Sequence, residues 1–218
     1  MNTSRTLLIC NGDPPPGTLL RRLAARASLI VAADGGANAA LRAGVRPHVV
    51  IGDLDSLLRA TARRLPRARI IRVARQDNTD LEKALDFIAA GAPSRVLIAG
   101  ATGGRVDFTL GNLSVFWNYT ERLACTFVGD GWRAVPVGRR RTERARPGVT
   151  VSLIPFGSCG GITLRGLKYA LRDAAMRTGE IGVSNVVASS PFTVTVKRGR
   201  MLMVIFDGVR AGKAWPPW

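Results

Sequence analysis

Apolar strand-like segments alternate with helical segments along the first part of the chain, and this alternation is the strongest constraint on the fold. Near-continuous apolar strands joined by helices indicate a parallel sheet with helices on both faces. We therefore predict an α/β, Rossmann-like domain over residues 1–128. The apolar runs, each closed by glycine or polar residues, predict strands at 6–10, 29–33, 49–51, 69–73 and 96–99. Helical spacing predicts helices at 18–26, in a segment ending near 43, and at 57–65, 80–90 and 107–122.

The pattern changes near residue 128. Short strand-like runs separated by Gly, Ser, Asn and Pro turns predict an antiparallel β-sandwich domain over residues 129–218, ending in a tail. The arginine-rich run at 139–146 is expected to be a solvated linker between strands. The runs that predict strands are 131–137, 149–155, 161–164, 182–187, 192–197 and 200–206.

Two aspartates close the third predicted strand, where Gly52 interrupts an apolar run and Asp53 and Asp55 follow. In an extended segment, residues two apart point to the same side, so the two carboxylates can converge on one point. Holding them together is costly unless a cation lies between them. For an isolated pair, a surface turn with solvated acids is the alternative.

Polar turns also follow the neighbouring predicted strands. Asp34 begins a Gly-Gly turn that opens a helix, residues 76–80 lead into the next helix, and residues 103–107 follow the last strand. Ligands of such sheets bind beyond the carboxyl ends of the strands, where these turns converge. Because the chain has few acids, 15 Asp and Glu in all, this placement predicts a metal or phosphate site.

Two cations belong to these turns. Lys83 lies one helical turn after Asp80, on the same face. It either forms a surface pair with Asp80 or neutralises phosphate oxygens. Arg105 carries a guanidinium that can bind phosphate through two parallel hydrogen bonds.

The net charge of +17, from 32 Lys and Arg against 15 Asp and Glu, raises the possibility of nucleic-acid binding. The arginines are spread over the whole chain, however, which is also typical of a GC-rich coding sequence. Three widely spaced cysteines, at 10, 125 and 159, indicate free thiols in a reducing compartment. With neither a signal peptide nor an apolar run that could span a membrane, we expect a cytoplasmic protein without a membrane contact.

Taken together, the motifs resemble those of the thiamine pyrophosphokinase family. The similarity covers nearly the whole chain, with the motifs in the family's order and spacing. The motifs of the first region are ADGGAN (33–38), GDLDS (52–56), QDNTDLEKA (76–84) and GGRVDFTLGNL (103–113). Those that resemble the family's thiamine-binding domain are VSLIPFG (151–157), GITLRGLKYAL (161–171) and GVSN (182–185).

This resemblance implies transfer of pyrophosphate from ATP to the hydroxyl of thiamine, giving AMP and thiamine diphosphate, with Mg²⁺ as cofactor. It also implies a homodimer with the active site at the subunit interface. The implied Mg²⁺ ligands and catalytic acids are Asp53, Asp55 and Asp80, one of which also orients the hydroxyl or accepts its proton. Lys83 and Arg105 are implied to bind the polyphosphate. Further nucleotide contacts are expected from Asp34, Thr79, Asp107 and Asn112, and thiamine contacts from Gln76 and from Ser184 and Asn185 of the partner subunit.

The chain departs from the family pattern in places. Phe108 stands where many relatives have histidine, and the only histidine, His48, is expected to be structural, so catalysis does not rest on a histidine base. The last strand carries Met201 and Met203 where eukaryotic-type members place a tryptophan that stacks on thiamine. As a hypothesis, a tryptophan of the tail, at position 215 or 218, takes this role.

Two other functions stay open at this point. A pyrophosphokinase for a hydroxymethyl pterin would share the nucleotide-binding half, and the second domain distinguishes it. A basic nucleic-acid-binding protein would explain the net charge but not the aspartates, which repel phosphate without a metal.

Overall fold

The computed structural model describes residues 4–75, 77–91, 94–180 and 182–208. The chain divides into two compact units, with the boundary between Asp130 and Gly131. Each unit has a hydrophobic cluster of its own, and each is described below by itself.

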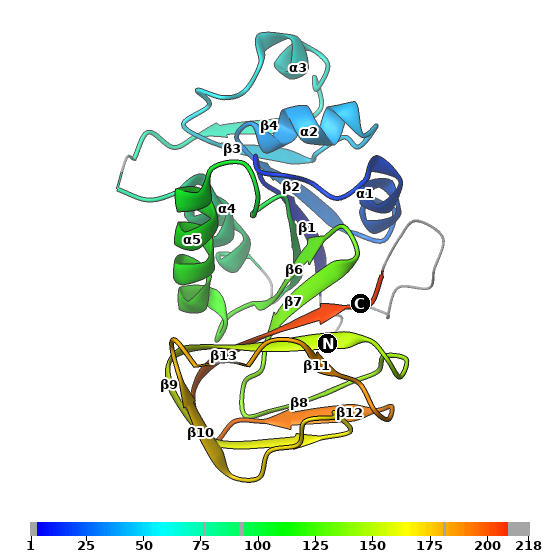
Figure 1. The fold of residues 1–218 in the computed structure, drawn as a ribbon. Helices are drawn as coiled ribbons and strands as arrows, with labels where there is room; N and C mark the ends of the chain where they lie inside the picture. The colour runs from blue at the N-terminus through cyan, green and yellow to red at the C-terminus, as the bar shows by residue number, and fades with distance from the viewer. Residues whose placement is uncertain (1–3, 76, 92–93, 181, 209–218) are drawn as a thin grey trace. The chain divides into compact units, whose positions relative to one another are not determined.

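The first unit is built on a parallel sheet of six strands in the order β4-β3-β2-β1-β5-β6 (Figure 1). All five neighbouring pairs are parallel. The central strands are apolar and buried because helices cover both of their faces. This confirms the α/β prediction. The strands are β1 (Ser4–Ile9), β2 (Leu29–Ala33), β3 (Val49–Gly52), β4 (Arg69–Arg72), β5 (Ser94–Ala99) and β6 (Ala124–Gly129).

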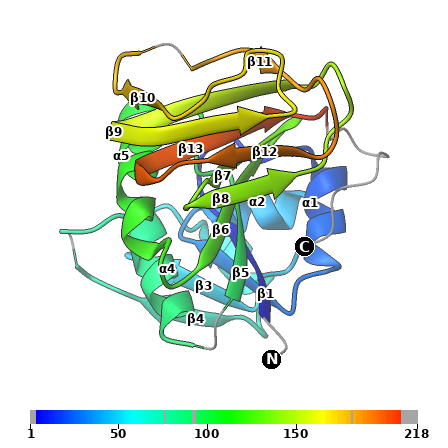
Figure 2. The same ribbon diagram turned by 90° about the horizontal axis from the view of Figure 1, so that it is seen from below.

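The helices of this unit lie on the two faces of the sheet. Both views show α1 and α2 on one face and α4 and α5 on the other (Figures 1 and 2). In α1, three buried leucines on one side account for its amphipathic pattern. The helices are α1 (Gly17–Ala24), α2 (Gly36–Arg42), α3 (Arg59–Arg63), α4 (Asp80–Ala89) and α5 (Val106–Val115), followed by a 3₁₀ turn, η1 (Phe116–Tyr119).

The strand order reverses direction at β1, because β2 lies on one side of it and β5 on the other. The turns after β1 and β5 are hydrogen-bonded to each other: Gly12 N–H donates to the Gly100 carbonyl at 2.7 Å and Asp13 N–H to the Thr102 carbonyl at 2.8 Å. In open α/β sheets, ligands bind in the crevice at such a switch point.

Four elements of the first unit differ from the prediction. The strand β4 forms at the predicted residues, but it is the edge of the sheet, and Ile70 is 42% exposed and not covered on both faces. The helix α3 spans only Arg59–Arg63, and the helix predicted to reach residue 122 ends at Val115 before η1. Strand β6 was not predicted, although it completes the sheet beside β5.

The second unit is the antiparallel β-sandwich that the sequence predicted. Its long strand β9 takes part in both sheets: it pairs with β11 and β13 along its first part, with β10 between residues 158 and 162, and with β12 at its end. The strand changes direction around Gly157 and Gly161, both with positive φ, where glycine is favoured. The strands are β7 (Trp132–Pro136), β8 (Arg140–Glu143), β9 (Thr150–Arg165), β10 (Ala174–Arg177), β11 (Asn185–Val186), β12 (Phe192–Thr195) and β13 (Arg198–Phe206).

The prediction of a solvated linker at 139–146 is wrong. Residues Arg140–Glu143 form β8, which pairs with β12. A run rich in charged residues predicts solvation, but pairing within the fold decides its structure here. In the structure, Glu143 accepts from Arg141 at 2.7 Å and from the buried Arg133 at 2.9 Å, so these charges are paired within the fold.

Among the described residues, no helix is both long enough and apolar enough to cross a membrane. The tail with tryptophans 215 and 218 lies outside the described residues, and so does the hypothesis that one of them contacts thiamine.

Candidate active site

A cleft of about 670 Å³ opens at the carboxyl ends of the strands in the first unit. Its walls come from the turns after β1, β3 and β5 and from the first turns of α4 and α5. The polar turns singled out from the sequence therefore meet at one place.

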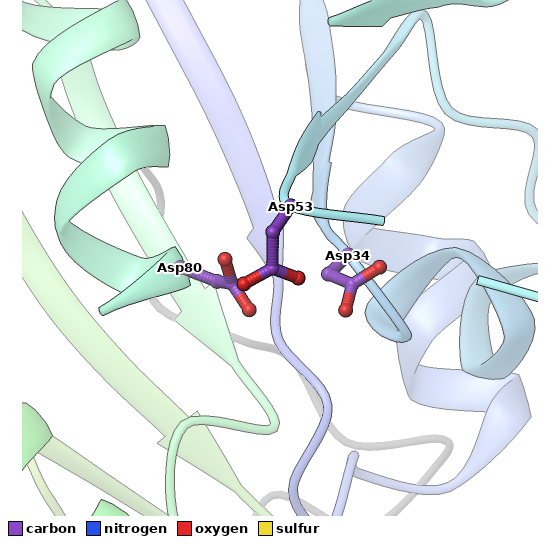
Figure 3. A group of neighbouring side chains, drawn as sticks. All are labelled: Asp34, Asp53 and Asp80. Carbon is purple, nitrogen blue, oxygen red and sulfur yellow. The ribbon is translucent and has the colours of Figure 1, made fainter. Parts of the chain in front are cut away.

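Three carboxylates lie close together, and two of them, Asp53 and Asp80, line this cleft (Figure 3). Asp34, Asp53 and Asp80 each offer an oxygen, and these oxygens lie within 4.8 Å of one another. Asp34 follows β2, Asp53 follows β3 and Asp80 begins α4. The structure thus brings together two of the predicted metal ligands with Asp34, which the resemblance had suggested as a nucleotide contact.

The backbone around Gly52 allows the acids to come this close. A Cβ at Gly52 would lie 2.8 Å from the Cβ of Asp34 and 3.1 Å from Oδ1 of Asp80. Asp34 itself has a φ of 43°, a left-handed conformation that aspartate tolerates better than most residues. Strained backbone of this kind is typical of functional sites.

Lys83 is the buried cation that pairs with two of the acids. Its side chain is only 2% exposed, and Nζ donates to Oδ1 of Asp80 at 2.9 Å and to Oδ2 of Asp53 at 3.3 Å. Burial would lower the pKa of Lys83, but its bonds to the two carboxylates outweigh burial and raise the pKa, so the ammonium stays charged. Lys83 is therefore both an ion-pair partner of Asp80 and a residue of the site.

Asp34 is the least solvated of the three acids, with 2% exposure. Burial, together with the nearby carboxylates of Asp55 and Asp80, raises its pKa to about 6, against the opposing bond from the Ser56 N–H. Its Oδ1 is buried, and no group among the described residues donates a hydrogen bond to it. An orphaned buried oxygen of this kind can take a cation or a water molecule as its partner.

Asp53 behaves in the opposite way. Burial would raise its pKa, but the N–H of Asp55 and the ammonium of Lys83 lower it below its ordinary value. Asp53 is therefore fully ionised near neutral pH.

Asp55 lies at the mouth of the cleft, exposed and outside the group of three. Its N–H donates to Oδ1 of Asp53 at 3.3 Å, and its own Oδ1 accepts from the Ser56 hydroxyl at 2.9 Å. Asn38 fixes this turn through two hydrogen bonds. Its amide donates to the Ser56 carbonyl at 2.8 Å, and its Oδ1 accepts from the Leu58 N–H at 3.2 Å.

Two of the predicted nucleotide contacts have structural bonds. Thr79 caps α4: its hydroxyl accepts from the Glu82 N–H at 3.2 Å, and the Glu82 carboxylate accepts from the Thr79 N–H at 2.9 Å. Asn112 is buried and donates to the Ala101 carbonyl at 2.8 Å, which fixes the turn after β5. Both residues line the cleft.

Arg105 and Asp107 form an exposed pair at the start of α5. Nε of Arg105 donates to Oδ1 of Asp107 at 3.1 Å, and Nη2 donates to Oδ2. These bonds lower the pKa of Asp107 and raise that of Arg105. Only Arg105 of the two borders the cleft.

Two of the predicted thiamine contacts belong to the second unit. In the second unit, Ser184 is exposed with a φ of 62°, whereas the side chain of Asn185 is buried and bonds both the N–H and the carbonyl of Tyr169. Asn185 thus orders the segment around the exposed Tyr169. Residue 76, the remaining predicted contact, lies outside the described residues.

Sequence reasoning missed the supporting roles of Gly52 and Asn38. Both belong to motifs that were noted, GDLDS and ADGGAN. The available signal was a polar residue, Asn38, inside an otherwise apolar helix start, which indicates a committed hydrogen bond.

Comparison with known proteins agrees with this geometry. The family model for the catalytic domain of thiamin pyrophosphokinase matches residues 20–127, and the model for the family's vitamin B1 binding domain matches residues 140–201. The chain belongs to the thiamine pyrophosphokinase family.

Individual members of the thiamine pyrophosphokinase family align over most of their length. Thiamine pyrophosphokinase 1 of Arabidopsis thaliana is 30% identical over 222 residues, covering 88% of this chain and 82% of the plant protein. The Bacillus subtilis thiamine pyrophosphokinase is 29% identical over 185 residues, covering 81% and 86%. The crystal structure of thiamin pyrophosphokinase from Geobacillus thermodenitrificans superposes with a TM-score of 0.82 at 26% identity, covering 95% of this chain and 99% of that one.

Proposed function

We propose that the cleft of the first unit transfers the pyrophosphoryl group of ATP to the hydroxyl of thiamine. The chain is a thiamine pyrophosphokinase by family, an ATP-dependent diphosphotransferase. The match of residues 140–201 to a vitamin B1 binding domain favours thiamine over a pterin as acceptor. The observation that carries the proposed site is the cluster of Asp34, Asp53 and Asp80 with its one orphaned, buried oxygen.

The donor set fits Mg²⁺. All three groups are carboxylates, the ligands that this hard cation prefers. Three carboxylates against the one ammonium of Lys83 leave two negative charges uncompensated, which one divalent cation offsets. The ligands proposed are therefore Asp34, Asp53 and Asp80. When bound, the cation would neutralise charge on the phosphate oxygens of ATP.

The chain's own residues then position the reactants. Lys83 holds Asp53 and Asp80 in place, and Arg105, paired with Asp107 through Nε and Nη2, keeps further N–H donors for phosphate oxygens. The hydroxyl oxygen of thiamine forms a bond to the β-phosphorus, the bond from that phosphorus to the oxygen bridging to the α-phosphate breaks, and AMP leaves. Asp55, at the mouth of the cleft, is proposed to orient the hydroxyl and take its proton.

We assign thiamine binding to the second unit, residues 131–208 of the described chain, and nucleotide binding to the first. Ser184 is the proposed direct contact, because it is exposed in a strained turn. Asn185 is proposed to support that turn and the Tyr169 segment, since its amide is already bonded.

A homodimer is proposed, with Ser184 of the partner subunit completing the site. Its support is the outer side of α5, where Val106 is 72% exposed and Leu110 is 62% exposed, one helical turn apart. Exposed apolar pairs of this kind mark interaction surfaces. Light scattering should give twice the chain mass, and the double variant Val106→Glu/Leu110→Glu should give a monomer. An unchanged dimer in that variant would place the interface elsewhere.

The proposed location is the cytoplasm. The three cysteines are free and buried, and burial raises the pKa of Cys10 and of Cys125 to about 12. Thiols stay reduced in a reducing compartment such as the cytoplasm.

The decisive assay incubates the protein with ATP, Mg²⁺ and thiamine and separates the nucleotides. AMP and thiamine diphosphate in equal amounts are expected, with no turnover after chelation of the metal. ADP in place of AMP would rule out pyrophosphoryl transfer.

A further inference from the structure

Phe108 is an aromatic side chain that lines the cleft and remains 48% exposed. It lies on the side of α5 that carries Asn112, one turn later, which also lines the cleft. Val106 and Leu110 lie on the other side of the helix. Phe108 is therefore placed toward the ligand space and not toward the apolar outer side.

Arg105 covers one face of the Phe108 ring. The guanidinium carbon of Arg105 lies 4.6 Å from the ring centroid, a cation–π contact. Arg105 is in turn fixed by Asp107. Phe108 and Arg105 thus form a flat, partly rigid platform at the wall of the cleft.

The space beside this platform is open at Gly104 but closed at Gly103. Both glycines have positive φ and line the cleft; a Cβ at Gly104 would meet no heavy atom within 4 Å, whereas a Cβ at Gly103 would clash with the carboxylate of Asp13. The turn that contains them follows β5, at the switch point of the sheet. Nucleotides bind at this position in α/β sheets.

The position of the platform selects between the two substrates, because it lies beside the turn after β5, where nucleotides bind in α/β sheets. A nucleobase is neutral and stacks on an aromatic or guanidinium plane.

We propose that Phe108, backed by Arg105, is the platform on which the base of the nucleotide stacks. This inference rests on the proposed function and assigns to it a residue that sets nucleotide affinity and base preference. Near the platform, the amide of Asn112 is committed to the Ala101 carbonyl and the guanidinium of Arg105 to Asp107. Recognition therefore depends on stacking area, and purine triphosphates are preferred to pyrimidine triphosphates by area alone.

The test compares steady-state kinetics of the wild type, Phe108→Ala, Phe108→Trp and a control. The control, Ile70→Ala, removes an apolar side chain of similar exposure, 42% against 48%, from β4 outside the cleft. Phe108→Ala should raise KM for ATP about 10-fold, since base stacking is typically worth ~1–3 kcal/mol. We expect unchanged kcat, an unchanged KM for thiamine and an unchanged inhibition constant for inorganic tripolyphosphate, which has no base. The preference for ATP over CTP should disappear. Phe108→Trp should keep both affinity and preference.

The outcomes separate the two claims. A wild-type protein that forms no AMP would overturn the proposed function and this inference with it. Normal wild-type turnover with an unchanged KM for ATP in Phe108→Ala would overturn the inference alone. So would a rise in KM for thiamine in place of ATP, or an equal loss of tripolyphosphate affinity.

Discussion

Each of the two units contains a buried charge network, and the two networks are built differently. In the second unit, Arg133 is 4% exposed and bonds Glu143 and Asp207, both at 2.9 Å, while Arg141 also bonds Glu143. In the first unit, Lys83 bonds Asp53 and Asp80, with Asp34 beside them.

The charge balance distinguishes them. The network of the second unit holds two arginines and two acids, so its charges cancel and it ties β7 and β8 to the end of β13. The cluster of the first unit holds three acids and one lysine beside a cleft. A balanced network serves the fold, whereas an excess of one sign held together at a cleft requires an external ion and serves function.

Removal of an acid from the unbalanced cluster should have the largest effect, and mainly on activity. Asp53→Asn removes a proposed metal ligand, so kcat/KM should fall by about 10²–10³-fold or more, while the unfolding free energy falls only slightly, because Lys83 keeps Asp80 as its partner. Kinetics and urea unfolding measure the two quantities. The matched control is Glu121→Gln, an exposed acid away from the cleft, which should change neither. A stability loss equal to that of a core variant would show that the cluster is structural.

Breaking the balanced network should do the reverse. Arg133→Met leaves Asp207 buried without its cation and should lower the unfolding free energy by about 3–5 kcal/mol. The activity per folded molecule should stay near that of the wild type. Arg177→Met, which breaks the exposed pair with Glu180, should cost less than about 1 kcal/mol. A specific loss of kcat in folded Arg133→Met would show that the network of the second unit serves function as well as the fold.

A methyl group at Gly52 tests the geometry of the cluster with its charges intact. Gly52→Ala should force Asp34 and Asp80 apart and weaken metal affinity about 10–100-fold. The apparent Mg²⁺ activation constant reports this change. Gly111→Ala in α5, where a Cβ meets nothing within 4 Å, is the control and should leave the constant unchanged. Equal constants for the two variants would mean that the acids need not be this close.

The smallest effect expected is a pH dependence of stability in metal-free buffer. Because the folded pKa of Asp34 is about 6 and its ordinary value is 3.8, the folded state binds more protons between these pH values. Stability should therefore fall by about 1–3 kcal/mol as pH rises from about 4 to about 6. Asp53, with its lowered pKa, contributes only at more acidic pH. Urea unfolding with a chelator should show this slope in the wild type and not in Asp34→Asn. A slope that persists in the variant would have another origin.

The sequence allowed the fold class to be predicted because apolar periodicity reports burial directly. The prediction was wrong where burial and composition disagree. Strand β4 is apolar at Ile70 and Ile71 yet lies at an edge, and β8 is charged yet is paired inside the second unit. Tertiary pairing, which no local pattern contains, decides both cases.

For the site, motif spacing predicted that Asp53, Asp80 and Lys83 lie together. Motif spacing does not show that Asp34, and not Asp55, joins Asp53 and Asp80 in the cluster. Asp55 follows Asp53 at the interval that aligns side chains in a strand, but β3 ends at Gly52 and the positive φ of Leu54, 69°, turns the chain away. Asp34 joins the cluster instead. Its segment is distant in the sequence, but it approaches closely because Gly52 has no side chain.

Direct metal binding tests the central claim most simply, with Mn²⁺ as a spectroscopic probe in place of Mg²⁺. Titration followed by electron paramagnetic resonance should show one site per chain in the wild type, competed by Mg²⁺. The site should be lost in Asp34→Asn and kept in Asp55→Asn. Equal Mn²⁺ binding by the wild type and Asp34→Asn would contradict the assignment of the orphaned carboxylate to a cation.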